Sequence, residues 1–283
     1  MKIGITIMAT DVSIGAAELA AAAEARGFSS LYLPEHTHIP TSRETPPPVG
    51  QEDVLPERYK RILDPFVALG ACAEATETLT IGTGICLVAQ RDPIATAKAV
   101  ATLDFMSGGR FVFGIGYGWN VDEMRDHGVA YDERRSVVRD FMLTMRALWA
   151  DEPQSFEGKH ASVSESWAWP KPARKPGPPV MIGGAAGPRL FAHVAEFGDG
   201  WLPVGGGGIK KSLPMLGEAA EAAGRDPSEL RVVPLWALPD RDKLDYYASL
   251  GIEEVVLQFP SEPRDPAMRT LDELAPLVDE FAS

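Results

Sequence analysis

The chain has 283 residues, 45% hydrophobic and 24% charged, a composition typical of globular proteins. Its 27 Lys and Arg against 40 Asp and Glu give a net charge of -13, which disfavours nucleic acid and anionic membranes as partners but leaves room for a local basic pocket. No stretch is apolar over the ~18 residues that a membrane span needs, and the N-terminus shows no secretory signal. We therefore expect a cytoplasmic protein.

The sequence contains few candidate metal ligands at suitable spacing. Cys72 and Cys86 stand in apolar surroundings without metal-site spacing, so we expect two buried thiols rather than a disulfide. Glu35-x-x-His38 presents two groups that can bind metals, but no third ligand follows nearby. We predict no metal site.

Short apolar runs alternate with helical patterns along the chain. The runs that predict strands are residues 2–9, 30–33, 79–88, 111–115, 180–182, 200–204, 231–238 and 253–259. A helical pattern follows each of them; a proline-rich excursion ending at Arg61 and the segment 151–179 are irregular. Such alternation indicates an α/β fold with a parallel sheet, and eight units favour one (β/α)8 TIM barrel domain spanning residues 1–283.

Two of the helices have a clear start signal. Asp64-Pro65 and Asp92-Pro93 each place an acidic residue at the cap position, where its carboxylate accepts a free backbone N–H. The proline then occupies the first helical position, where no N–H is needed. The second helix ends at Ser107-Gly108-Gly109 and joins the runs 79–88 and 111–115 into a βαβ unit.

Glycines interrupt both strands of that unit. Gly82 and Gly84 lie in the first strand, and Gly114, Gly116 and Gly118 lie at the end of the second. Glycine in a strand often marks a bulge or the close approach of another backbone or a ligand. Tight packing between strands is the other interpretation, and the residues alone favour neither. Neither run completes the G-x-G-x-x-G fingerprint of dinucleotide-binding proteins.

In (β/α)8 barrels the active site lies at the carboxyl ends of the strands. His36 follows the second expected strand, and Tyr117, Trp119 and Asn120 follow the fourth. Histidine can hold or deliver a proton near neutral pH, so His36 is the candidate catalytic residue, with a structural role as the alternative. Tyr117 and Trp119 are candidate apolar walls of the site.

Two glycine-rich loops are candidate phosphate sites. Residues 183–188, GGAAGP, lead from a buried strand into a helix, whose free N–H groups attract anions. Arg189 follows directly, and Lys210 and Lys211 open the helix after the glycine run 205–208. We predict phosphate binding because two such loops lie on neighbouring strands. The alternative is a pair of short turns with solvated cations.

Together these segments resemble the luciferase-like monooxygenase superfamily, specifically the actinobacterial branch of oxidoreductases that use the deazaflavin coenzyme F420. The matching pieces are LYLPEHTHIP at 31–40, LTIGTGICLV at 79–88, RDPIATAKAVATLDFMSGGRFVFGIGYGWN at 91–120 and PVMIGGAAGPRLFAHVAEFGDGWLP at 179–203. They follow the family's order over most of residues 1–205. The C-terminal third carries little family signal.

The resemblance implies a luciferase-like barrel with the coenzyme ring at its carboxyl-terminal mouth. A bulge in the third strand, which often holds a non-proline cis peptide, would back the ring at Gly84-Ile85. The phosphate would lie against residues 183–185 and 205–206, and His36 matches a histidine used near the ring in some relatives. The family also suggests a homodimer. The expected coenzyme-binding residues are His36, Gly84, Ile85, Gly116, Tyr117, Trp119, Asn120, Gly183, Gly184, Ala185, Gly205 and Gly206.

We predict an oxidoreductase that moves a hydride between C5 of F420 and an unknown small organic substrate, which His36 protonates or orients. The first alternative is an FMN-dependent luciferase-like monooxygenase, and the second is a non-catalytic flavin- or deazaflavin-binding protein. Trp119 stands where some relatives carry a glutamate, which argues against a sugar-phosphate dehydrogenase. Trp167 and Trp169 are further candidate walls, although ordinary packing is the favoured interpretation for both.

Overall fold

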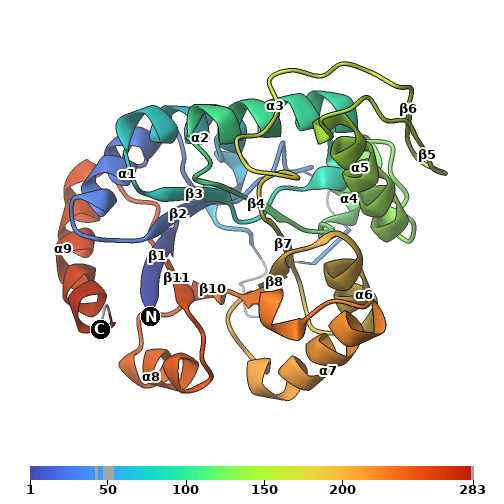
Figure 1. The fold of residues 1–283 in the computed structure, drawn as a ribbon. Coiled ribbons are helices and arrows are strands. Elements are labelled where there is room, and N and C mark those ends of the chain that lie inside the picture. Colours follow the sequence, from blue (N-terminus) through green and yellow to red (C-terminus); the bar gives the residue numbers. More distant parts are fainter. Residues whose placement is uncertain (42–43, 47–53, 282–283) are drawn as a thin grey trace.

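The computed structural model describes residues 1–41, 44–46 and 54–281, so part of the expected proline-rich excursion lies outside the described residues. A parallel nine-stranded sheet runs through the described chain in the order β10-β11-β1-β2-β3-β4-β7-β8-β9 (Figure 1). Its strands are β1 (Lys2–Thr6), β2 (Ser30–Leu33), β3 (Thr80–Thr83), β4 (Phe111–Ile115), β7 (Val180–Gly183), β8 (Gly200–Leu202), β9 (Arg231–Val232), β10 (Leu235–Ala237) and β11 (Glu254–Gln258).

The sheet closes on itself because its two end strands belong to one stretch of chain. β9 pairs with β8 and β10 pairs with β11, and only Val233 and Pro234 separate β9 from β10. The sequence predicted one continuous strand at 231–238. Proline has no N–H for the ladder, so the strand is interrupted at Pro234. The predicted α/β barrel is otherwise confirmed.

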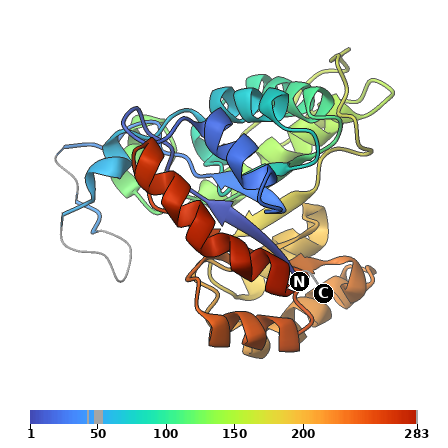
Figure 2. The same cartoon turned by 90° about the vertical axis from the view of Figure 1, so that its left-hand side faces the viewer.

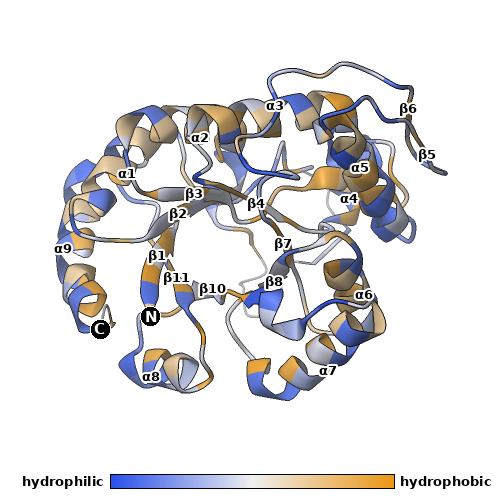
Figure 3. Ribbon diagram, in the orientation of Figure 1, coloured by the Kyte–Doolittle hydropathy of each residue, from blue (hydrophilic) through white to orange (hydrophobic). Residues whose placement is uncertain are grey.

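Helices cover the outside of the sheet, with their hydrophobic faces turned towards it (Figure 3). The N-cap predictions are confirmed: Asp64 accepts from Phe66 N at 2.9 Å, and Asp92 accepts from Ala95 N at 2.7 Å. The helices are α1 (Ala16–Glu24), α2 (Pro65–Ala75), α3 (Pro93–Met106), α4 (Val121–Asp126), α5 (Arg134–Trp149), α6 (Pro188–Phe197), α7 (Ile209–Ala222), α8 (Arg241–Ser249) and α9 (Arg264–Phe281), with 3-10 turns η1 (Glu57–Lys60), η2 (Val88–Gln90) and η3 (Pro227–Glu229).

The two ends of the described chain lie side by side. α9 packs along α1, and the Met1 amino group donates to Phe281 O at 2.5 Å (Figure 2). No described helix has the length and apolar character to cross a membrane.

The segment 151–179 forms a small hairpin of β5 (Phe156–Glu157) and β6 (Ser162–Val163) on the outside of the barrel. Trp167 and Trp169 are 86% and 65% exposed, so neither is packed in a core, and the favoured interpretation of both was wrong. Cys72 and Cys86 are buried free thiols, as predicted. The homodimer stays a prediction.

A bulge replaces the end of the third predicted strand. β3 ends at Thr83, the peptide bond between Gly84 and Ile85 is cis, and η2 follows. The bulge that the resemblance implied at Gly84-Ile85 is confirmed, whereas the continuous strand expected over 79–88 was wrong beyond Thr83. The Ile85 side chain packs across β4 and β7. A Cβ on Gly116 would lie 1.8 Å from Ile85 Cδ1, and one on Gly183 would lie 2.9 Å from Ile85 Cγ2.

Packing also explains the other glycines of these strands. A Cβ on Gly82 would lie 2.4 Å from Tyr32 Cε1, and one on Gly114 would lie 2.0 Å from Thr83 O. Both atoms belong to neighbouring strands of the sheet. Both glycines therefore make room for the protein's own atoms: a packed side chain at Gly82, as the packing interpretation predicts, and the close approach of another backbone at Gly114.

We predict that Gly116→Ala lowers the free energy of unfolding by about 1–3 kcal/mol, because its methyl group collides with Ile85. Combining it with Ile85→Ala should recover part of that loss, since the colliding group is gone. Urea denaturation of the single and the double variant measures both changes in the free energy of unfolding. Gly70→Ala on α2 is the matched control, because a Cβ there meets nothing within 4 Å. Strictly additive effects of the two substitutions would contradict this account.

Candidate active site

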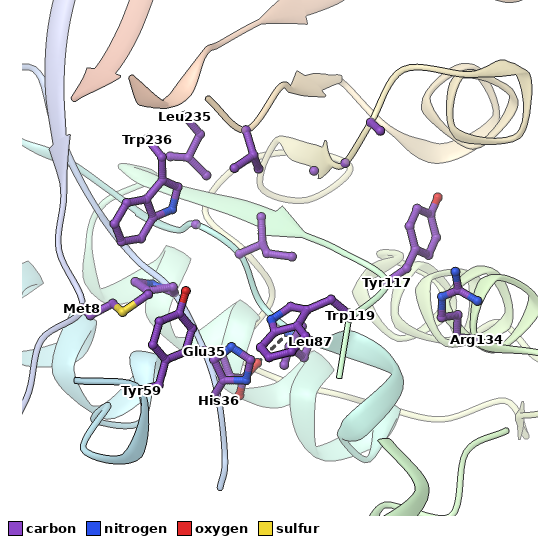
Figure 4. A pocket seen from close by; sticks show the side chains of 18 of the residues that line it. Met8, Glu35, His36, Tyr59, Leu87, Tyr117, Trp119, Arg134, Leu235 and Trp236 are labelled. Atoms are coloured by element: carbon purple, nitrogen blue, oxygen red, sulfur yellow. Dashed lines mark hydrogen bonds between the residues drawn. The ribbon is translucent and has the colours of Figure 1, made fainter. Parts of the chain in front are cut away.

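A cavity of about 640 Å³ opens at the carboxyl ends of the strands, where the barrel rule places the site (Figure 4). Its walls come from strand ends around the barrel, from η1 and from the start of α5. Of the residues predicted from the sequence, His36, Gly84, Ile85, Tyr117, Trp119, Gly183, Gly184 and Ala185 line it.

A buried carboxylate fixes the segment next to His36. Glu35 is 3% exposed; its Oε2 accepts from Leu87 N at 2.7 Å and its Oε1 accepts from Arg91 Nε at 2.5 Å. Arg91 also pairs with Asp64 at 2.6 Å. Glu35 therefore joins the end of β2 to the chain after β3. His38 pairs instead with Asp126, at 3.0 Å, and the described residues contain no group of three ligands around either.

His36 is oriented by a second buried carboxylate. Its Nδ1 lies 2.8 Å from Glu123 Oε2, and the side chains of His36 and Glu123 are 8% and 0% exposed. Thr37 N donates to the other oxygen of Glu123 at 3.2 Å. Asn120, which caps α4, accepts from Glu123 N at 3.4 Å and so holds the carboxylate in place. Asn120 itself does not line the cavity.

This pair can perform acid–base chemistry. A carboxylate at Nδ1 keeps a proton on that nitrogen and leaves Nε2 for a ligand in the cavity. Nε2 accepts a hydrogen bond when the ring is neutral and donates one when it is protonated. The His36 ring also contacts Tyr59 and Trp119, at centroid distances of 5.6 and 5.7 Å, which limit its rotation.

Sequence reasoning missed Glu123, although a signal was present. Asn120-x-x-Glu123 has the spacing of an N-cap followed by an acidic residue at the third helical position, a pattern that begins a helix. Because that helix follows β4, its first turn faces the mouth of the barrel. The two facts together place a carboxylate beside the strand ends.

The other end of the cavity is basic. Arg134 and Arg135 lie in the first turn of α5; the Arg135 guanidinium stacks 4.2 Å from the Tyr117 ring centroid. Arg134 Nε and Arg135 Nη1 are buried and have no hydrogen-bond partner among the described residues. Buried unpaired guanidinium nitrogens are costly unless an anion binds them. This observation fits the phosphate of a flavin or deazaflavin.

Tyr117 is fixed on this side of the cavity. Its hydroxyl lies 2.8 Å from His193 Nδ1 on α6. Burial raises the pKa of Tyr117 to about 12, so the hydroxyl stays protonated near neutral pH. Burial also lowers the pKa of His193. Tyr117 thus remains a neutral surface under the Arg135 guanidinium.

Several predicted residues lie away from the cavity. A Cβ on Gly206 would lie 1.9 Å from the Tyr247 hydroxyl, so this glycine makes room for α8, and Gly205 forms the preceding turn. Gly116 lies behind Ile85 rather than in the wall. The cations that sequence reasoning proposed for the anion site, Arg189, Lys210 and Lys211, are exposed and do not line the cavity.

Comparisons with known sequences identify the family of the chain. A model of the family described as luciferase-like monooxygenase matches residues 9–238. An uncharacterized protein of Mycobacterium tuberculosis is 39% identical over 277 residues, which cover 97% of this chain and 98% of that protein. An F420-dependent hydroxymycolic acid dehydrogenase of the same organism is 30% identical over 184 residues, covering 63% of this chain and 50% of that protein.

Two solved structures share the fold. Monooxygenase RslO1 from Streptomyces bottropensis aligns with a TM-score of 0.79 and 20% identity over 100% of both chains. An F420-dependent secondary alcohol dehydrogenase, in complex with an F420-acetone adduct, aligns with a TM-score of 0.74 and 20% identity over 98% of this chain and 99% of that one. The family and these relatives indicate an oxidoreductase acting on small molecules. The chain belongs to the luciferase-like monooxygenase family.

Proposed function

We propose that this protein is an F420-dependent oxidoreductase that moves a hydride between the deazaflavin coenzyme and a small organic substrate. One observation carries the proposal: a single cavity holds a buried histidine–carboxylate pair and, apart from it, two arginines with buried unpaired nitrogens. The first suits proton transfer and the second suits an anionic coenzyme. A relative that is 30% identical is named as F420-dependent.

Arg134 and Arg135 would hold the coenzyme phosphate, with the turn at Gly184 and Ala185 beside it. Ile85 would back the ring from the bulge after β3. When bound, the coenzyme supplies or accepts the hydride at C5. The protein binds the coenzyme, orients it and shields it from water. All of these residues line the cavity.

His36 would manage the proton that accompanies the hydride. Its Nε2 would hydrogen-bond the substrate oxygen, donating a proton when a carbonyl is reduced and accepting one when an alcohol is oxidised. Glu123, bonded to Nδ1, would compensate the positive charge of the protonated ring. Exclusion of water by Tyr59 and Trp119 strengthens both interactions.

Binding titrations of the apo-protein with F420 and with FMN test the coenzyme. We expect F420 to bind with a micromolar or lower Kd and FMN to bind much more weakly. The fluorescence of the coenzyme reports binding in both titrations. Arg134→Gln and Arg135→Gln should each weaken F420 binding about tenfold or more, because each loses a charge-assisted hydrogen bond. Arg139→Gln is the matched control, since Arg139 lies on the same helix but pairs with Glu196 at 2.6 Å outside the cavity.

Two results would count against the F420 assignment. A preference for FMN would point to a monooxygenase instead. Binding of neither coenzyme, or binding that both arginine variants leave unchanged, would mean that the basic end does not hold a phosphate.

Replacing His36 tests the acid–base role. His36→Ala should lower turnover about 100-fold or more while F420 affinity is kept, because the proton donor is lost but the coenzyme contacts remain. Glu123→Gln should lower turnover less, because the imidazole keeps its place but loses the carboxylate that orients it. The control is His38→Ala, whose imidazole is 42% exposed and outside the cavity. Unchanged turnover in His36→Ala would refute the role.

A further inference from the structure

The part of the cavity around His36 differs in chemistry from the basic end. It is lined by Met8 after β1, Tyr59 on η1, Trp119 after β4 and Trp236 on β10, on the side away from Arg134 in Figure 4. We call these four residues the aromatic end. Met8 and Tyr59 are 6% and 5% exposed, and the two tryptophans pack against them while staying only partly buried. Their remaining surface faces the cavity.

Trp236 reaches the cavity through an irregular backbone. Its φ is 60°, and among the described residues it is the only non-glycine with a positive φ. The register of β10 against β11 shifts between Leu235 and Ala237. Leu235 and Trp236 therefore both line the cavity, although neighbours in a regular strand point to opposite faces. An aromatic side chain held in so rare a conformation is typical of a functional position.

The aromatic end offers a ligand mainly apolar surface and scattered hydrogen-bond donors. Glu35 is engaged with Leu87 and Arg91; the other polar groups here are His36 Nε2, Arg58, Gln258, the Tyr59 hydroxyl and the indole N–H groups of the two tryptophans. A sugar phosphate would lose water from many hydroxyls and find too few replacements. A ring compound with a single oxygen needs one partner for that oxygen and apolar surface for the rest.

We propose that the substrate is an uncharged cyclic or aromatic carbonyl compound, or the corresponding alcohol. Its ring packs against Tyr59, Trp119 and Trp236, and its oxygen bonds His36 Nε2. This inference rests on the proposed function. In the reductive direction the carbonyl carbon receives a hydride, with its two electrons, from the reduced coenzyme. The C=O π bond breaks, and the oxygen takes the proton from His36. Coenzyme is oxidised and substrate reduced; the alcohol reacts by the reverse steps.

Calorimetric titration of the F420-loaded protein tests the aromatic end. The probes are 2-cyclohexenone and acetophenone, with glucose 6-phosphate as the comparison. We expect Trp236→Gly and Trp119→Leu to raise the Kd of the ring ketones about tenfold, and Trp236→Gly to leave F420 affinity unchanged. Glycine adopts a φ of 60° freely, so Trp236→Gly preserves the backbone. Trp169→Leu is the matched control, because Trp169 is 65% exposed and outside the cavity.

Three outcomes would overturn the substrate class: tighter binding of glucose 6-phosphate than of the ring ketones, ring-ketone affinities that neither tryptophan variant changes, or loss of ring-ketone binding in Arg58→Gln. Failure of the unsubstituted protein to bind F420 would overturn the proposed function instead. The coenzyme titration thus separates the two failures.

Discussion

The mouth of the barrel depends on the buried carboxylate of Glu35. It joins three segments that the sheet alone does not hold together, namely the end of β2, the chain after the Gly84-Ile85 bulge, and, through Arg91, the start of α2. A buried ion pair contributes little net stability but is costly to break from one side. The Glu35–Arg91 pair serves mainly to fix the positions of the segments that it joins. His36 follows Glu35 directly, so the carboxylate that anchors the bulge also sets where the imidazole begins.

Two neighbouring glutamates thus have separate tasks because their partners differ. Glu35 faces a guanidinium and a backbone N–H, both permanent donors, and acts as a fixed link. Glu123 faces the imidazole of His36, whose other ring nitrogen is left for a ligand in the cavity. The same functional group links segments of the chain in one place and orients a side chain of the cavity in the other. The glycines of β3, β4 and β7 serve this arrangement by leaving room for Ile85 and Tyr32.

Much of the fold could be read from local patterns. The Asp-Pro pairs at 64–65 and 92–93 begin helices because capping and proline geometry are local effects. The apolar pattern alone could not delimit the third strand, because Gly84 and Ile85 look like any apolar strand residues; only the family resemblance placed a bulge there. The glycine pattern was correctly noticed, but only the partners at 1.8–2.9 Å distinguish packing from ligand approach.

Sequence reasoning assigned the cations of an anion site to residues that do not line the cavity. Lys210 and Lys211 looked suitable next to glycines, whereas Arg134 and Arg135 looked like solvated residues of a long helix. The better signal was electrostatic: a helix N-terminus disfavours positive charge, so two arginines in a first turn at the barrel mouth are candidates for binding an anion. Trp236 gave no signal at all, because its rare φ arises from the register shift between β10 and β11.

Most of the aromatic end comes from other parts of the chain than the basic end. Met8 and Tyr59 lie near the start of the chain and Trp236 lies on β10, whereas Arg134, Arg135 and the turn at Gly184 come from its middle, as does Trp119, the fourth residue of the aromatic end. The contacts for one molecule can therefore be rebuilt by mutation while those for the other are kept. Such a barrel can acquire contacts for a new ligand at one end of its cavity over evolution while the other end stays unchanged. For an enzyme engineer, the residues at positions 8, 59 and 236 are the ones to randomise.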